Sequence, residues 1–293
     1  MIVPKKAAFL LIGRKEELKR IRENVAKGRH TLLEGRIGIG KSHLLRYLEK
    51  SLKRAVYVER IYPLKAALLD ILKHLHQHGR LKSPPDGGRD WETLSRKFTR
   101  LHVKSLAEFV VKQMKGRRYI LLLDQLEAVT PAITATLNQL LSSALVIGAA
   151  SKLKEAHRKV WWAFDLIELP PLTREESLEL LYQIIGGEPV ENREMFENKV
   201  LTQADGNPHA VVEMARQAGA EERVTPQFIR GLRHPAGVKY LDITPLLLLV
   251  GTCVVAARFF AMGIDNTDLY ILAGIGGAFF IFFRYFIYKG MRG

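Results

Sequence analysis

An eight-residue stretch, GRIGIGKS, constrains the fold of this chain more than any other part of its sequence. It runs from Gly35 to Ser42 and has the spacing G-x-x-x-x-G-K-[ST]. An apolar run at 31–34 precedes it, and helical periodicity follows from Lys41 to about Lys53, which is the strand, loop and helix that this motif requires. Glycine lets the backbone wrap a phosphate chain with its N–H groups inward, at the positive end of the new helix. The segment therefore predicts a nucleotide-binding loop.

Each part of this phosphate-binding loop, or P-loop, has an expected role. Lys41 is expected to reach the outer phosphates, and the Ser42 hydroxyl is expected to bind Mg²⁺. We assign nucleotide contact to the whole segment and to the residue after it: Gly35, Arg36, Ile37, Gly38, Ile39, Gly40, Lys41, Ser42 and His43. ATP and Mg²⁺ are therefore the expected cofactors.

A buried strand that ends in a carboxylate supplies the expected magnesium partner. The apolar run YILLL fills 119–123, and Asp124 follows it directly. Ligands of open α/β sheets bind at the carboxyl ends of the strands, which is where this carboxylate would lie. We expect Asp124 to hold Mg²⁺ together with Ser42; a helix N-cap is the alternative role for Asp124.

The order of apolar runs and helical patterns predicts an α/β fold, a P-loop NTPase core with a parallel sheet covered by helices. We expect this core over 1–170, a small helical domain over 171–233 and a linker over 234–245. The run AAFLLIG near the start is too short for a signal peptide, so we expect it to belong to the core. Strands are expected at 31–34, 55–59, 119–123, 144–150 and 164–169.

Two long apolar runs predict a transmembrane helical hairpin over 246–288. Each run has about 20 residues, enough to cross a bilayer at about 1.5 Å per residue, and each contains one charge, Arg258 or Arg284. A buried hairpin of a soluble domain is the alternative. Basic residues flank the hairpin on both outer sides, so the positive-inside rule places both termini and the core in the cytoplasm, at the cell membrane.

Arg258 lies inside the first apolar run and needs a partner or a route to water. We expect it to reach the outer membrane interface or to pair with Asp265 or Asp268. A polar contact within an oligomer is the alternative for this residue.

The chain is strongly basic, which indicates an anionic neighbour. Lys and Arg number 45 against 30 Asp and Glu, for a net charge of +15. The last 50 residues carry four basic and two acidic side chains, so +13 of that charge lies before them. Anionic lipid at the inner leaflet, an acidic protein partner and nucleic acid are the candidates. Cys253 is the single cysteine, which excludes an intramolecular disulfide and a Cys-rich metal site.

Several segments together resemble one group of ATPases, the AAA+ and STAND-type P-loop ATPases. FLLIGRKEEL at 9–18 is similar to their opening segment, FDLIELPPLT at 164–173 to their last core strand, and Gly206-Asn207-Pro208 to the G-N-P motif of their lid. The resemblance covers about 9–218 and makes 171–233 the helical lid. It implies that the nucleotide acts as a switch for assembly or drives a motor on DNA or protein.

The sequence departs from these relatives where the attacking water is activated. They usually carry an acidic residue directly after the magnesium aspartate, and this chain has Gln125, whose amide cannot act as a general base. Glu59, at the end of the strand after the P-loop helix, is the preferred substitute, with Glu127 second. Ser151 and Lys152 lie where such ATPases place a γ-phosphate sensor.

The lid sensor also departs from the pattern. His209 falls where the resemblance expects an arginine that contacts the nucleotide, and a histidine is a weaker, titrating substitute. Elsewhere, His74 and His78 share a helical face without a Cys or carboxylate nearby in sequence, so we expect an exposed polar helix end and not a metal site.

These features predict a membrane-anchored ATP-binding protein and slow ATPase. It would act as a nucleotide-dependent switch that recruits a protein partner, or assembles with its own copies, at the cytoplasmic membrane face. A membrane-tethered DNA-binding ATPase and a pseudo-ATPase that only binds nucleotide are the alternatives.

Overall fold

The computed structural model describes residues 11–82, 90–116, 118–152, 158–186, 190–221, 223–234, 244–264 and 267–290. The side chains of 158, 244–248 and 282–290 lie outside this description. Two compact units, Met1–Gly237 and Val238–Gly293, divide the chain. Asp265, one of the partners expected for Arg258, lies outside the described residues.

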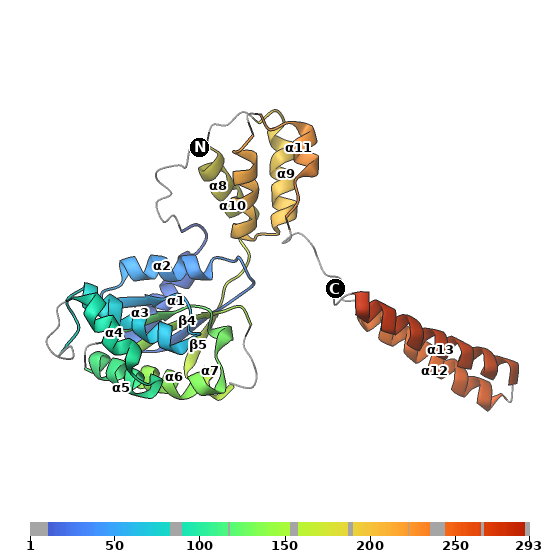
Figure 1. The fold of residues 1–293 in the computed structure, drawn as a ribbon. Helices are drawn as coiled ribbons and strands as arrows, with labels where there is room; N and C mark the ends of the chain where they lie inside the picture. The colour runs from blue at the N-terminus through green and yellow to red at the C-terminus, as the bar shows by residue number, and fades with distance from the viewer. Residues whose placement is uncertain are drawn as a thin grey trace. The chain divides into compact units, whose positions relative to one another are not determined.

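A five-stranded sheet with the order β2-β3-β4-β1-β5 forms the centre of the first unit (Figure 1). All of its neighbouring strands pair in parallel, which confirms the α/β fold with a parallel sheet. Every residue of β3 is buried, as expected for a strand covered on both faces. The strands are β1 (His30–Glu34), β2 (Ala55–Val58), β3 (Ile120–Leu123), β4 (Leu145–Ala150) and β5 (Phe164–Glu168).

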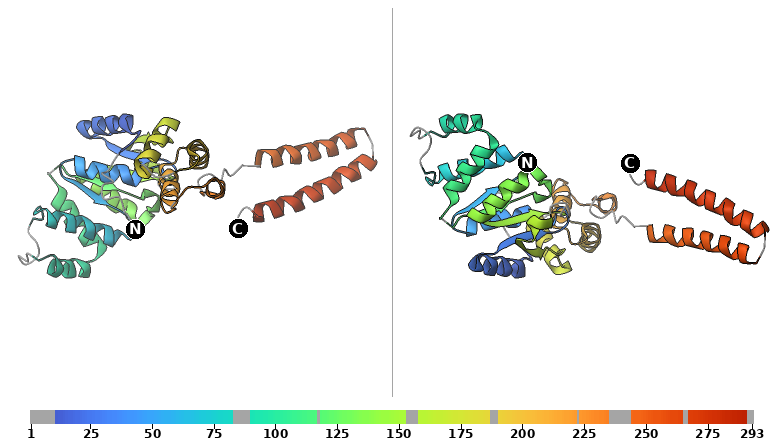
Figure 2. Two further views of the ribbon diagram at one scale, coloured as in Figure 1. Left: turned by 90° about the horizontal axis from the view of Figure 1, so that it is seen from above. Right: turned by 90° about the horizontal axis from the view of Figure 1, so that it is seen from below.

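Helices cover both faces of this sheet and form two separate cores. Leu32 belongs to one core and its neighbour Leu33 to the other, because successive strand residues point to opposite faces. One face packs against α1 (Lys15–Lys27) and α2 (Lys41–Ser51). Figure 2 shows α1 on the side opposite α4 and α5. The other face is covered by α3 (Leu64–Gln77), α4 (Trp91–Arg100), α5 (Val103–Met114) and α6 (Pro131–Ser143).

Two short helices complete the core. The 3-10 helix η2 (Leu126–Ala128) follows β3, and α7 (Arg158–Trp161) precedes β5. Leu126 is fully buried, and a Cβ added at Gly148 of β4 would lie 2.3 Å from its Cδ1. The turn after β3 is therefore packed down onto the middle of the sheet.

Four helices follow the sheet in the chain: α8 (Arg174–Ile185), α9 (Arg193–Ala204), α10 (Pro208–Ala218) and α11 (Pro226–Gly231). They enclose a third hydrophobic core of their own, which includes Phe196, Val200 and Met214. Thr173 and Glu176 form a capping box at the start of α8. We call these four helices the lid.

The second unit consists of two packed helices, α12 (Thr244–Gly263) and α13 (Thr267–Gly290). Gly251 allows them to approach closely, since a Cβ there would lie 2.9 Å from the Phe280 ring. Within the part of these helices that the structure describes, no stretch is both long and apolar enough to cross a membrane, so the predicted transmembrane helices are not found there.

Among the described residues, Arg258 contacts Tyr270 of the neighbouring helix. Its Nη2 donates to the hydroxyl of Tyr270 at 2.6 Å, and its Cζ lies 4.9 Å from the centre of that ring. Tyr270 offers both an acceptor oxygen and an aromatic face, which suits a guanidinium.

Candidate functional site

The P-loop folds as a tight turn between β1 and α2. Gly38 has φ 81° and Gly40 has φ 99°, which is left-handed backbone that favours glycine. Lys41 begins α2 and curls back, so that its Nζ donates to the carbonyl oxygens of Gly35 at 2.7 Å and Arg36 at 2.9 Å. The ammonium group therefore lies over the concave side of the loop.

A cavity of about 590 Å³ adjoins the P-loop and has the size of a small-molecule site. Its wall is formed by the first described segment, the P-loop, the end of β3 and the lid. Of the residues that the sequence analysis named as site candidates, twelve line it: Ile37, Gly38, Ile39, Gly40, Lys41, Ser42, His43, Asp124, Gln125, Glu127, Ser151 and His209. Gly35 and Arg36 belong to the same loop but are not among the residues that line the cavity.

Asp124 is held from both of its carboxylate oxygens. The backbone N–H of Gln125 donates to Oδ1 at 2.8 Å, and the hydroxyl of Tyr57 donates to Oδ2 at 3.1 Å. The carboxylate is 3% exposed and faces the cavity. Each oxygen keeps a further lone pair, so this carboxylate and the Ser42 hydroxyl form a donor set that fits Mg²⁺.

Burial and neighbouring charges act on two groups of the site. Burial lowers the pKa of Lys41, whereas the negative charges of Glu127, Asp124 and Glu34 act in the opposite direction. Burial also raises the pKa of Tyr57 to about 12, so its hydroxyl stays protonated and donates to Asp124 at neutral pH.

The geometry favours Glu127 over Glu59, the reverse of the ranking from sequence. Glu59 follows β2, is exposed, and its Oε2 lies 3.9 Å from Nη2 of Arg46; the described residues that line the cavity do not include it. Glu127 lines the cavity, and its Oε2 accepts from the backbone N–H of Ser151 at 3.2 Å. Glu127 lies in the 3-10 helix η2 just after Asp124, and this turn places its side chain at the cavity. The alternation of side chains along a strand does not predict that position.

The two residues expected to sense the γ-phosphate differ in their relation to the cavity. Ser151 follows β4 and lines the cavity, next to Glu127. Lys152 is exposed and does not belong to the described lining.

The lid is bonded directly to the P-loop. The Nδ2 of Asn207 donates to the carbonyl oxygen of Ile37 at 2.8 Å, and the backbone N–H of His209 donates to that of Gly38 at 3.2 Å. A Cβ at Gly38 would lie 2.6 Å from Oδ1 of Asn207, so only glycine allows this approach. An ion pair of 3.5 Å between Arg36 and Asp205 flanks the contact.

Sequence reasoning missed two arginines in the cavity wall. Arg216 lies on α10 seven residues after His209, which is two helical turns on the same face, and the helical period is the signal that could have found it. Its Nη1 pairs with Oε1 of Glu213 at 2.9 Å. Arg14 is buried, pairs with Glu17, and donates from Nη2 to the carbonyl oxygen of Ile39 at 3.1 Å.

The histidines at the end of α3 match the expected exposed helix end in part, since His78 is exposed whereas His74 is partly buried. The rings of His74 and His78 stack with centres 4.2 Å apart, and Oε1 of Glu49 on α2 lies 3.9 Å from Nδ1 of His74. Burial lowers the pKa of His74 to about 4. Among the described residues, no group of three or more side chains is arranged to hold a metal.

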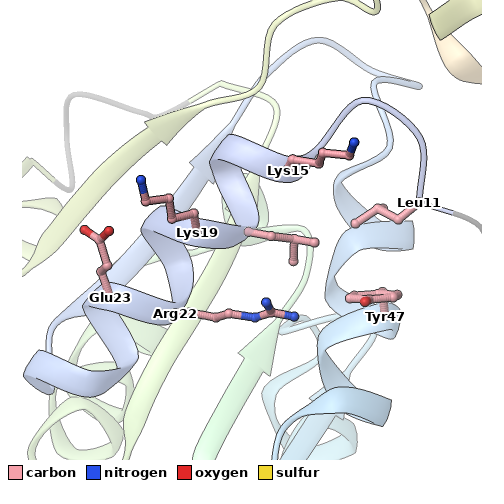
Figure 3. Close-up of a pocket in the computed structure, with 7 residues that line it drawn as sticks. Leu11, Lys15, Lys19, Arg22, Glu23 and Tyr47 are labelled. Atoms are coloured by element: carbon pink, nitrogen blue, oxygen red, sulfur yellow. The ribbon is translucent and has the colours of Figure 1, made fainter.

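A second hollow, of about 620 Å³, lies between α1 and α2 (Figure 3). Lys15, Lys19 and Arg22 line it at helical spacing, with Glu23 as the acidic member. Tyr47 of α2 faces this hollow. Part of the chain's positive charge is therefore concentrated beside the ATPase core.

Comparison with known proteins identifies the family. The family model for the AAA ATPase domain matches residues 10–158, half of the chain. A search of curated protein sequences gives no significant match.

One solved structure shares the fold, and a second is similar to a lesser degree. A Walker-type ATPase of Pyrococcus abyssi is similar with a TM-score of 0.56 and 14% identity, over 92% of this chain and 81% of its own. The RuvB Holliday junction branch migration motor of Thermotoga maritima follows with a TM-score of 0.46 and 13% identity, over 90% of this chain and 88% of its own.

Proposed function

The chain belongs to the AAA ATPase domain family, and from this we propose that it is a slow, Mg²⁺-dependent ATPase that works as a nucleotide-controlled switch. The observation that carries the proposal is the pair of hydrogen bonds from the lid to the P-loop carbonyls of Ile37 and Gly38. They couple the position of the lid to the conformation of the loop that takes the phosphates.

The binding step uses residues that already face the cavity. Lys41 would leave its two loop carbonyls and donate to the outer phosphates, while Ser42 and Asp124 would hold Mg²⁺. Bound Mg²⁺ would neutralise charge that develops on the phosphate oxygens. The purine base of ATP would lie against an apolar wall on the lid side of the cavity, formed by Leu172, Leu180 and Val212.

Slow hydrolysis follows from where the carboxylates lie. Gln125 can orient water through its amide but cannot accept a proton from it. Glu127 is the remaining carboxylate of the cavity wall beside Ser151, and we assign it the role of general base.

The switch would operate through α10. Asn207 begins this helix and touches the P-loop, and Arg216 two turns later lines the same cavity, in the role that sequence analysis gave to His209. A bound phosphate chain could change the orientation of the P-loop carbonyls that accept from the lid, or attract Arg216 away from Glu213. Either change would move the lid relative to the sheet.

We further propose that α12 and α13 anchor the protein in the cytoplasmic membrane with both termini inside. Counted with 244–248 and 282–290, whose side chains lie outside the description, the helices have 20 and 24 residues, about 30 and 36 Å at about 1.5 Å per residue. Apolar side chains more than half exposed lie along both of them, and such a surface needs cover from water. They are Leu249, Val255, Phe259, Phe260, Met262, Ile271, Leu272, Phe279 and Ile281.

The switch would then recruit a protein partner, or further copies of this chain, at the membrane. A DNA-tethering ATPase is the second candidate, favoured by the three basic side chains around the hollow between α1 and α2. DNA binding that weakens steeply with salt and is lost in Arg22→Glu would support the second candidate.

Hydrogen–deuterium exchange of the full-length protein in detergent tests the switch. ATP should change exchange in the peptide that covers 205–216, whereas the peptide of α11, away from the P-loop, is the control and should respond little. ATP binding without any response at 205–216 would contradict the switch and leave ATP binding intact.

A further inference from the structure

One side chain connects the two elements that supply the candidate magnesium ligands. Ser42 stands at the start of α2, and Asp124 stands after β3, so their separation depends on how the helix sits against the sheet. Tyr57 of β2 contacts both elements. Its hydroxyl donates to Oδ2 of Asp124 at 3.1 Å, and Cζ of Arg46 on α2 lies 5.2 Å from the centre of its ring.

The strand register explains how Tyr57 reaches Asp124. Tyr57 pairs with Leu122, so both side chains point to the face that carries α2. Asp124 lies two residues beyond Leu122 and therefore points to the same face. The pairing continues past the end of the strand, because the N–H of Asp124 donates to the carbonyl oxygen of Val58 at 3.0 Å.

The helix register explains the other end of the connection. Arg46 follows Ser42 by four residues, so both lie on one face of α2, one turn apart. The contact between Arg46 and the Tyr57 hydroxyl raises the pKa of Arg46. The exposed Glu59, 3.9 Å from Nη2 of Arg46, holds the guanidinium from the far side.

We propose that Tyr57 is a positioning residue for Mg²⁺, tied to α2 through Arg46 and to the end of β3 through Asp124. The proposal rests on the Mg–ATP site described above. It also gives Glu59 a role, as the outer anchor of Arg46, in place of the catalytic role expected from sequence.

The chemistry of the Tyr57 hydroxyl suits this task. With Gln125 donating to Oδ1 and Tyr57 donating to Oδ2, the carboxylate plane of Asp124 is fixed while each oxygen keeps a lone pair for the metal or its water. Phenylalanine at position 57 would fill the same space but would leave Oδ2 without this donor. The carboxylate could then rotate away from the orientation that these two bonds give it.

The experiment measures metal dependence and not turnover. A fluorescent ATP analogue is bound to the full-length protein in detergent, once in EDTA and once at rising Mg²⁺. Tyr57→Phe should raise the Mg²⁺ concentration for half-maximal enhancement of binding by about tenfold, with binding in EDTA unchanged. Tyr47→Phe is the matched control on α2, since Tyr47 faces the hollow of Figure 3, and it should behave as the parent.

The outcomes separate the two proposals. An unchanged or lower half-maximal Mg²⁺ concentration in Tyr57→Phe, with the parent showing clear Mg²⁺ enhancement, would overturn the positioning role and leave the ATP site in place. A parent protein that binds the analogue without any effect of Mg²⁺ would overturn both. If Tyr57→Phe does not fold, Arg46→Met should show a shift in the same direction, and no shift there would count equally against the proposal.

Discussion

The side chain of Asn207 caps α10 with its oxygen and bonds the P-loop with its nitrogen. Its Oδ1 accepts from the N–H groups of His209 and Ala210 at 3.0 and 3.4 Å, while its Nδ2 donates to the carbonyl oxygen of Ile37 at 2.8 Å. One amide therefore fixes both the first turn of a lid helix and the loop expected to hold phosphate.

Removal of this amide should uncouple the lid from the nucleotide. Asn207→Ala loses an N-cap and should lower the free energy of unfolding by about 1 kcal/mol. Asn192 caps α9 in the same way, since its Oδ1 accepts from the N–H of Met195 at 2.9 Å, so Asn192→Ala should cost a similar amount. Only Asn207→Ala should abolish the ATP-dependent change of hydrogen exchange at 205–216. An equal loss of response in both variants would mean that the effect is general destabilisation.

Lys41 should be required for nucleotide binding. Because its ammonium group supplies the main positive charge to the outer phosphates, Lys41→Ala should remove the rise in melting temperature that ATP produces in the parent. Lys53, an exposed lysine just beyond the other end of α2, is the control, and Lys53→Ala should keep the full rise. Undiminished stabilisation of Lys41→Ala by ATP would refute the assignment of the site.

Hydrolysis should depend on Glu127. Glu127→Gln keeps the shape of the side chain but removes the proton acceptor, so turnover should fall by about a hundredfold, the scale for losing a general base. Glu59→Gln should change turnover far less, since Glu59 lies outside the described cavity wall. Gln125→Glu should raise the rate. Phosphate release is the measurement, and a Glu127→Gln protein as active as its parent would exclude this base.

His74 should make stability depend on pH. Its pKa is about 4 in the folded protein and about 6.5 when unfolded, so between these values the unfolded chain binds a proton that the folded one does not. Stability is then full above pH 6.5 and falls as the pH drops towards 4, by up to about 3 kcal/mol. In His74→Gln the denaturant midpoint should fall less over this window than in the parent. The exposed His102 provides the control, His102→Gln, and the same slope in all three proteins would contradict the prediction.

Membrane insertion should give the hairpin turn and the core opposite accessibility. In a Cys253→Ala background, a thiol reagent that cannot cross membranes should label Thr267→Cys in intact cells but not Ser51→Cys. After cell lysis both should react. Labelling of both in intact cells, or of neither, would contradict the proposed topology.

Sequence patterns predicted the sheet well because each strand carries its own signal. The apolar runs before Gly35 and Asp124 became β1 and β3, and the motif between β1 and α2 became the P-loop. The ends of elements were predicted less well. β2 stops at Val58, so Glu59 lies outside the sheet and turns to Arg46.

The missed parts of the site depend on contacts between distant segments. Gln125 adopts left-handed backbone at φ 55°, and this turn places Glu127 in the cavity although it is three residues beyond Asp124. The link from Tyr57 to Asp124 depends on the pairing of β2 with β3, which no local pattern contains. Arg216 could have been predicted from the sequence. It lies seven residues after His209, so helical spacing places both on the same face of α10, the face that lines the cavity.

The hydrogen bonds of Lys41 to its own loop affect how quickly the site could exchange its ligand. Two of the three N–H donors of the Lys41 ammonium group already bond the carbonyl oxygens of Gly35 and Arg36, so an arriving phosphate has to replace existing bonds. The same two oxygens can accept the ammonium group again when the phosphate leaves. We therefore expect the loop to lower both the affinity for phosphate and the time for which it stays bound, and with it the lifetime of each switched state.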